Sequence, residues 1–318
     1  MRKRILQQSI TKKYVFFYML AMLLLFLLSE PTVAIEGARL GLMLWANRLL
    51  PSLLPFMILT QLLIRSGYLD AIANKLHIRH SYFVLFAGTL FGFPMGCKLT
   101  ADLFEHGHLS AKEASTLFII SNQMSPAFVG GYILSETLKM PQLIPVTYLI
   151  FYGPSFLYGL LRLHRLSVGK QSNSKKACEA KKSTSGLQIN VAVLDAGIMN
   201  SFETMLKLGA YVMLFSIMTA MCRHFLSAFP ALYTTIAGIL EVTGAVSALD
   251  DFFTDTRLKY IAILFATAFG GCSGIAQTAS IIRAGQKASG LSLVKYIQGR
   301  LVIAGITALL ALISCSLL

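Results

Sequence analysis

Phe91-Gly92-Phe93-Pro94-Met95-Gly96-Cys97-Lys98 and Phe269-Gly270-Gly271-Cys272-Ser273-Gly274-Ile275-Ala276-Gln277 are the two stretches that decide the fold. Each interrupts a hydrophobic run, and the two occupy comparable places in the two halves of the chain. Glycine and proline leave backbone N–H and C=O groups without helical partners, which a membrane tolerates only where protein or water satisfies them. One interrupted segment in each half indicates the binding site of a transporter.

The composition is that of a membrane protein. Hydrophobic residues make up 55% of the 318 residues and charged residues 13%, whereas a soluble domain carries about a quarter charged residues. Apolar segments of about 20 residues, long enough to cross a bilayer, recur along the chain. We predict an all-α, polytopic integral membrane protein with two pseudo-repeats, each holding a broken or re-entrant helix. The expected segments are Tyr14–Ile35, Leu40–Ile64, Tyr82–Phe104, Ala114–Leu134, Leu143–Leu163, Met205–Phe225, Ala231–Leu249, Tyr260–Ile282 and Leu293–Leu317.

The net charge of +14 is distributed as a topology signal rather than as a nucleic-acid surface. Basic residues cluster before the first apolar segment and again between Ser167 and Asn190, the only long polar interval. Such clusters beside membrane spans face the cytoplasm, and they also attract anionic lipid headgroups. We therefore expect both the N-terminus and this linker to be cytoplasmic.

The domain division follows from these features. Residues 1–36 form a basic segment and a first transmembrane helix, 37–163 the first half, 164–190 the cytoplasmic linker and 191–318 the second half. Five apolar segments precede the linker, so a cytoplasmic N-terminus and linker require one of them not to cross. The candidate is Tyr82–Phe104, whose glycines and proline let it enter the membrane and return. An extra apolar stretch in the second half, Ala231–Leu249, leaves open whether the repeats are inverted or parallel.

The first break resembles a known family. Residues 92–101 closely resemble the G-[FY]-P-x-G-x-K-[LI]-T-A signature of the sporulation integral membrane proteins with nucleoside-recognition (Gate) domains. The stretches 50–56, 121–128, 238–244 and 269–277 are also similar to this family. The resemblance implies a transporter-like membrane fold, a bacterial cytoplasmic or forespore membrane, and a dipicolinate-like cargo, which is a small aromatic dicarboxylate.

The residues around the first break suit an anionic solute. The N-terminus of the helix that follows presents free N–H groups and partial positive charge, where carboxylates bind well. Lys98 adds a full charge and Thr100 a hydroxyl, although Lys98 is equally compatible with snorkelling or with pairing to Asp102. The substrate-binding candidates of the first half are Gly92, Phe93, Pro94, Gly96, Lys98, Thr100, Asn122 and Ser125.

The second half offers matching polar groups without a charge at the break. Its candidates are Gly270, Gly271, Ser273, Gly274 and Gln277, so we expect any asymmetry in binding to favour the Lys98 side. Glu241 is the only acid in Thr234–Leu249 and is a candidate for proton coupling, with a structural carboxylate as the alternative. Glu203 and Lys207 are spaced as a helix pair, and with Asp195 they indicate an interfacial amphipathic start to Val191–Leu208.

Three functions remain open, and none of them is enzymatic. A transporter of a small anionic or nucleoside-like solute is favoured. One alternative is a Gate-type metal permease that uses Cys97 and Cys272 as soft ligands. The other is a non-transporting scaffold in a sporulation or envelope complex. His106 and His108 lack a third ligand, and the five dispersed cysteines form no metal motif. No cofactor or catalytic motif is evident. The expected partners are the bilayer and a solute, with an oligomer or other membrane proteins left open.

Overall fold

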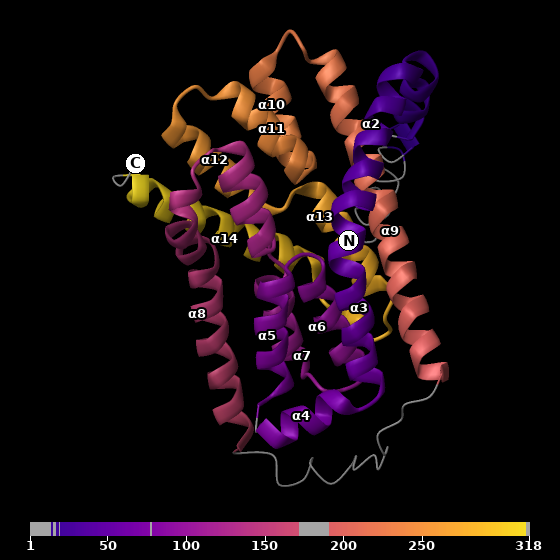
Figure 1. Ribbon diagram of the computed structural model, residues 1–318, viewed down its shortest axis with the longest axis vertical. Coiled ribbons are helices and arrows are strands. Elements are labelled where there is room, and N and C mark those ends of the chain that lie inside the picture. The colour runs from indigo at the N-terminus through magenta and orange to yellow at the C-terminus, as the bar shows by residue number, and fades with distance from the viewer. Residues whose placement is uncertain (1–13, 15–16, 19, 77, 172–190, 316–318) are drawn as a thin grey trace, which may run out of the picture.

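The computed structural model describes residues 14, 17–18, 20–76, 78–171 and 191–315, and this part of the chain forms helices without a strand (Figure 1). Four helices among the described residues are long and apolar enough to cross a membrane: Pro141–Leu166, Val191–Phe225, Thr256–Arg283 and Leu293–Ser314. The prediction of an all-α polytopic membrane protein is therefore confirmed.

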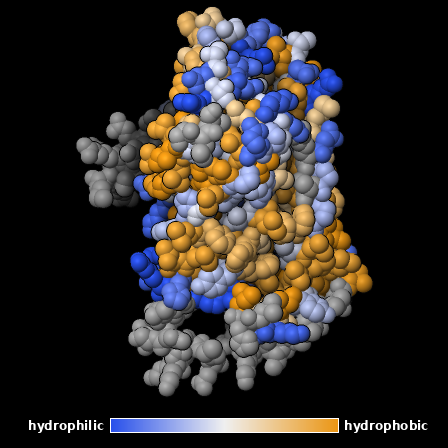
Figure 2. All heavy atoms as spheres, turned by 60° about the vertical axis from the view of Figure 1, so that its left-hand side comes forward, coloured by the Kyte–Doolittle hydropathy of each residue, from blue (hydrophilic) through white to orange (hydrophobic). Residues whose placement is uncertain are grey.

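The surface is apolar over the middle of the molecule. Figure 2 shows hydrophobic residues across the central zone and hydrophilic residues toward the two ends. Large apolar side chains such as Leu28, Leu149 and Met199 are 72%, 73% and 68% exposed. Water would disfavour so much exposed apolar area, whereas lipid chains accept it, so this zone marks the membrane-embedded part.

The N-terminal helices differ from the expected spans. The helix Leu20–Ser29 bends by 111° into the run Pro31–Asn47, so the predicted span Tyr14–Ile35 is not one straight helix. Pro31 starts a new helix because proline fits the first turn, where its missing N–H is not needed. From there α2 (Pro31–Leu44), the π-helical η1 (Trp45–Leu49) and α3 (Leu50–Arg65) follow one another directly, and the short α4 (Tyr68–Leu76) comes after them.

The predicted segment Tyr82–Phe104 enters the fold and returns. It consists of α5 (His80–Phe91) and α6 (Met95–Glu105), which pack against each other and join at the turn Gly92–Pro94, where the Phe93–Pro94 peptide is cis. A Cβ on Gly88 would lie 2.9 Å from the Cα of Gly96, so this approach requires glycine. The break is shorter than expected, since residues 95–98 already belong to α6.

A broken helix follows this hairpin. The helix α7 (Ala111–Ile120) ends at the non-helical gap Ser121–Ser125, and the π-helical η2 (Ala127–Thr137) continues beyond it. A short η3 (Pro141–Leu143) leads into α8 (Ile144–Gln171). Because α8 is helical to Gln171, the predicted linker 164–190 begins inside a helix, and its remainder, 172–190, lies outside the described residues.

The second half repeats the order of a long helix, a hairpin, a broken helix and a long helix. The long helix α9 (Val191–Phe225) is continuous over 35 residues, so the predicted interfacial start at Val191–Leu208 runs without a break into the predicted span Met205–Phe225. The hairpin is α10 (Pro230–Leu240) and α11 (Val242–Phe252), joined at Glu241, and it occupies the extra stretch Ala231–Leu249. The broken helix is α12 (Thr256–Phe269) and α13 (Gly271–Arg283), and η4 (Ala288–Gly290) and α14 (Leu293–Ser314) complete the chain.

The two halves are arranged in opposite directions. In Figure 1 the α5–α6 hairpin rises from the end that carries α4, and the α10–α11 hairpin descends from the other end. The turn Gly92–Pro94 therefore corresponds to Glu241, and the gap Ser121–Ser125 corresponds to Gly270. The expected pairing of the Gly92 break with the Gly270 break is corrected, since one lies in a hairpin and the other in a broken helix. This is the order of an inverted repeat.

Charge separates the two ends of the molecule. The α6–α7 connection lies at the end with α4, because the His108 ring centroid lies 4.8 Å from that of His80 at the start of α5. The α13–α14 connection lies beside it, since Lys287 Nζ donates to the backbone oxygen of Glu105 at 2.7 Å. Its basic residues are Arg65, Lys75, Arg79, Lys112, Arg162, Arg165, Arg283, Lys287 and Lys295. The opposite end is mixed, with Glu136, Asp250, Asp251 and Asp255 beside Lys139, Arg223, Arg257 and Lys259. The positive-inside rule predicts that the α4 end, where α8 ends and α9 begins, is cytoplasmic.

Candidate functional site

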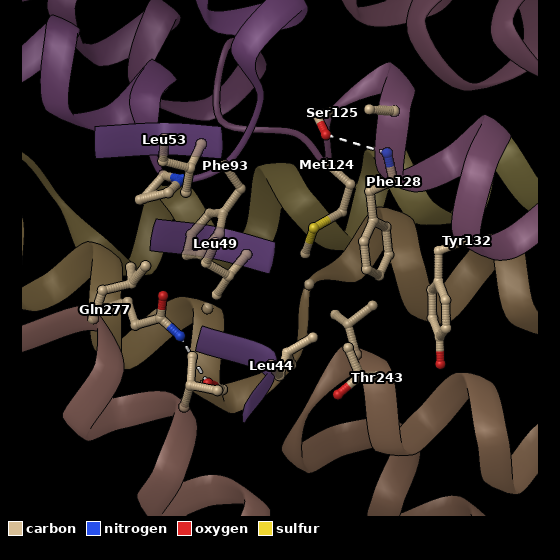
Figure 3. Close-up of a pocket in the computed structure, with 18 of the residues that line it drawn as sticks. Leu44, Leu49, Leu53, Phe93, Met124, Ser125, Phe128, Tyr132, Thr243 and Gln277 are labelled. Carbon is tan, nitrogen blue, oxygen red and sulfur yellow. Dashed lines mark hydrogen bonds between the residues drawn. The ribbon is translucent and has the colours of Figure 1, made fainter. Parts of the chain in front are cut away.

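The two hairpin turns and the two helix gaps meet at one cavity of about 460 Å³. Its wall includes Phe93 and Pro94 of the first hairpin, Ser125 of the α7–η2 gap, Glu241 of the second hairpin and Gly270 of the α12–α13 gap. Figure 3 shows Phe93, Met124 and Phe128 of the first half facing Gln277 and Thr243 of the second. Both predicted breaks thus come together, along with two interruptions from the other elements.

The rest of the wall is largely apolar and aromatic. The helices α2, α3 and α9 close the cavity with Leu44, Leu53, Phe56, Leu208 and Val212, and η2 adds Tyr132 and Glu136. A volume of this size and an aromatic wall with a few polar groups suit a small organic solute. Glu136 and Glu241 are the only charged residues among the lining residues of the described chain.

Close backbone packing fixes the first hairpin turn against the α7–η2 gap. Gly92 has a φ of +72°, and a Cβ there would lie 2.6 Å from the Cα of Ser125. The N–H of Phe93 donates to the backbone oxygen of Gln123, and a Cβ on Gly96 would overlap the backbone oxygen of Ser121. These contacts satisfy part of the unwound backbone and place the Phe93 ring beside the cavity.

The α12–α13 gap leaves polar groups free at the cavity. Gly270 is left-handed with a φ of +89°, and no side chain caps the N-terminus of α13. Gln277, which is 5% exposed, donates from Nε2 to Ser273 Oγ at 2.8 Å. Its Oε1 is buried without a hydrogen-bond partner. A buried acceptor without a partner is costly, so this amide can receive a hydrogen bond from a bound solute.

Glu241 is the residue that ends α10 and begins α11. Its carboxylate accepts a hydrogen bond from the N–H of Gly244 at 2.8 Å and another from the hydroxyl of Thr243. It is therefore an N-cap whose negative charge lies at the positive end of α11. The side chain also lines the cavity, so its coupling role stays a prediction.

Several predicted site residues lie behind the cavity wall instead. Thr100 is fully buried and donates to the backbone oxygen of Gly96 at 2.7 Å. Asn122 accepts from the N–H of Cys97 and donates to Thr278 Oγ1 and Tyr296 Oη, so it joins α7 to α6, α13 and α14. The predicted residues that line the cavity are Phe93, Pro94, Ser125, Glu241, Gly270, Ser273, Gly274 and Gln277, whereas Gly92, Gly96, Lys98, Thr100, Asn122 and Gly271 do not.

Lys98 belongs to a polar network outside the cavity. Its Nζ lies 2.9 Å from Asp102 Oδ1 and donates to Asn200 Oδ1 at 3.3 Å. Gln61 closes the ring, since its Nε2 donates to Asp102 and its Oε1 accepts from Asn200. This network joins α3, α6 and α9 and borders a neighbouring cavity of about 190 Å³, which shares Leu208 and Gln277 with the larger one.

The cysteines and histidines singled out from the sequence also lie away from the cavity wall. Cys97 is fully buried in α6, Cys272 is partly buried in α13, and neither lines the large cavity. His106 and His108 lie in the α6–α7 connection, where the His108 ring centroid is 4.8 Å from that of His80.

Sequence reasoning missed one charged residue beside the site. Arg300 is 1% exposed, lies on α14 and donates to the backbone oxygen of Ala268, just before the Gly270 gap. The sequence does contain a signal for this residue, since Arg300 is a charged residue inside the apolar segment Leu293–Leu317. A charge at membrane depth marks a candidate functional residue.

The comparison with curated proteins finds one close enough to inform the function. The chain is 26% identical to the sporulation integral membrane protein YlbJ of Bacillus subtilis strain 168 over 293 residues, covering 80% of this chain and 72% of that protein. This similarity, together with the apolar helices, supports a multi-pass membrane protein. No family model and no solved structure matches the chain.

Proposed function

We propose that this protein is a membrane transporter linked to sporulation, and that it binds a small aromatic carboxylate in the cavity between its two halves. The observation that carries the proposal is the meeting of four interrupted segments at one 460 Å³ cavity. Interrupted helices are costly in a membrane, so four of them around one space are best explained by a ligand that uses their backbone groups.

The polar and apolar parts of the wall support this solute class. The uncapped N-terminus of α13 offers free N–H groups to a carboxylate, next to Ser273 and Gln277. The rings of Phe93 and Phe128 offer flat faces to an aromatic ring. A dipicolinate-like solute combines both features. A nucleoside-like solute would stack on the same rings and bond to Gln277. It carries no carboxylate, so the free N–H groups at the N-terminus of α13 would have no anion to bind.

A row of cavities suggests the route of the solute. The central cavity shares Glu241, Thr243 and Tyr132 with a third cavity of about 410 Å³, which reaches Arg223 near the end opposite α4. On the other side lies the 190 Å³ cavity beside Lys98. The long helix α9 contributes to all three, so it forms a common wall along the proposed path.

Uptake by reconstituted vesicles tests the proposal. Labelled dipicolinate should accumulate in vesicles that contain the protein, and unlabelled dipicolinate should compete with it. Gly274→Leu should abolish uptake because Gly274 lines the cavity, with the Phe93 ring 3.8 Å from an added Cβ. Gly238→Leu is the matched control, since no atom lies within 4 Å of a Cβ at that helical glycine.

The other functions predict different results. Uptake of labelled uridine without competition by dipicolinate would indicate a nucleoside-like solute. Transport of a metal ion that is lost in the Cys97→Ala, Cys272→Ala double variant would indicate a permease. Absence of uptake of every solute by folded, correctly inserted protein would overturn the transporter and favour a scaffold.

A further inference from the structure

Arg300 is a buried cation whose hydrogen bonds are incomplete. It is the largest of the fully buried side chains in the described part of the chain. One guanidinium nitrogen, Nη2, donates to the backbone oxygen of Ala268, while Nε and Nη1 are buried and have no hydrogen-bond partner in the described part of the chain. Among the described residues no carboxylate forms an ion pair with it.

This guanidinium lies directly behind the α12–α13 gap. A Cβ on Gly270 would be 3.9 Å from Nη2 of Arg300, and Gly270 itself lines the cavity. One turn earlier on α14, Tyr296 accepts a hydrogen bond from Asn122 of the other gap. One face of α14 therefore lies behind both broken helices, and Arg300 places a positive charge behind the Gly270 backbone.

Capping alone does not account for this charge. The C-terminus of α12 carries about half a negative charge, which compensates a guanidinium only in part. A full charge buried without a counter-ion is expensive, and a neutral amide could donate to Ala268 at lower cost. The backbone of Glu241 lies against Gly271, but its carboxylate accepts from Gly244 and Thr243.

We propose that Arg300 selects an anionic group of the solute at the Gly270 end of the cavity, acting across the thin glycine backbone without touching the solute. This inference rests on the proposed function and deepens it, since it names the residue that makes the cavity select anions. Gly270 keeps the backbone between the guanidinium and the cavity thin, since a Cβ there would lie 3.9 Å from Nη2 of Arg300.

The test compares a dianion with a neutral molecule of the same shape. The probes are dipicolinate and pyridine-2,6-dicarboxamide, and equilibrium binding is measured on the purified full chain in lipid nanodiscs. At a separation of about 7 Å and an effective dielectric of 20, loss of the charge weakens binding of one carboxylate about 50-fold. Arg300→Gln should lose this factor for dipicolinate and change dicarboxamide binding less than about 2-fold, while Arg300→Lys should keep most of the preference. Arg283→Gln, on the exposed end of α13, is the matched control and should change neither.

Each outcome decides the inference. Equal weakening of both probes in Arg300→Gln would mean that Arg300 only caps α12, and unchanged binding of both would mean that the solute does not sense its charge. If Arg300→Gln does not fold, thermal melting of the unmodified protein decides: dipicolinate should raise the melting temperature more than the dicarboxamide, and equal stabilisation overturns the selection. Failure of the unmodified protein to bind either probe would instead overturn the proposed solute class, and this inference with it.

Discussion

Neutralising Lys98 and Asp102 singly and together separates a structural role of this pair from a role in solute binding. The two side chains are only 12% and 13% exposed, and their charged atoms lie 2.9 Å apart. Removing one partner of a buried pair leaves an uncompensated charge, which costs about 3 to 5 kcal/mol, and the partial exposure here favours the lower value. We expect Lys98→Gln and Asp102→Asn each to lower the free energy of unfolding by about 3 kcal/mol, and the double variant by no more than about 1 kcal/mol.

The assay is reversible unfolding in mixed micelles, followed by circular dichroism, with uptake measured on the same preparations. Lys207→Gln is the matched control: Lys207 and Glu203 have the same i, i+4 spacing but are 49% and 66% exposed, so its effect should stay below about 0.5 kcal/mol. A double variant no more stable than the single ones would refute the pairing argument. A double variant that is stable but does not transport would show that Lys98 binds the solute, as the sequence-based hypothesis expects. Recovery of both stability and uptake would assign Lys98 to the network with Gln61 and Asn200.

Other consequences of the structure can be measured in the same preparations. Gly96→Ala should lower the unfolding free energy by about 3 kcal/mol because its Cβ would overlap the backbone of the α7–η2 gap, whereas Gly305→Ala, with open space around it, should raise stability slightly; equal melting temperatures would contradict this. Gln277→Leu should weaken binding of a solute that carries an N–H donor, such as pyridine-2,6-dicarboxamide, about 10-fold in a binding titration, since the acceptor Oε1 of the buried amide is lost; unchanged affinity would place that solute elsewhere. A cysteine at Thr254 should react with an impermeant thiol reagent in intact cells and one at Ser289 should not, because Thr254 lies at the end opposite α4 and Ser289 at the basic α4 end; the reverse pattern would invert the topology.

The interruptions with a local cause could be predicted from the sequence. Gly92, Pro94 and Gly270 each remove helical hydrogen bonds or adopt a positive φ, and this shows in the chain without knowledge of its neighbours. The break at Glu241 is different, because a carboxylate within an apolar run is equally a buried acid or a helix cap. Only the hydrogen bond to Gly244 shows that it starts a new helix, so Ala231–Leu249 is a hairpin where the sequence indicated one span.

The partners of each interruption depend on tertiary contacts that no local pattern encodes. Lys98 follows its break by four residues, but in a helix this places its side chain toward Asp102 and Asn200 and away from the cavity. The hairpin and the broken helix also look alike in sequence, since both are glycine-containing interruptions of apolar runs. Their pairing between the halves becomes clear only from the packing of α5 on α6 and of α10 on α11.

The charge asymmetry of the site is the reverse of the one expected from the sequence. The second break holds no charged residue of its own, but Arg300 reaches its α12 carbonyl end from α14, and Glu241 caps the adjacent α11. The positive charge of Arg300 lies at the C-terminus of α12, and the negative charge of Glu241 lies at the N-terminus of α11. Each charge stabilises the helix end whose partial charge is opposite. The first half satisfies its gap with neutral amides, since Asn122 bonds to Cys97, Thr278 and Tyr296. Under the proposed function, an anionic group would face Arg300 and the N-terminus of α13 on the second half, and an aromatic ring would meet Phe93 and Phe128 on the first. This division would orient the proposed aromatic carboxylate with its anionic group toward Gly270.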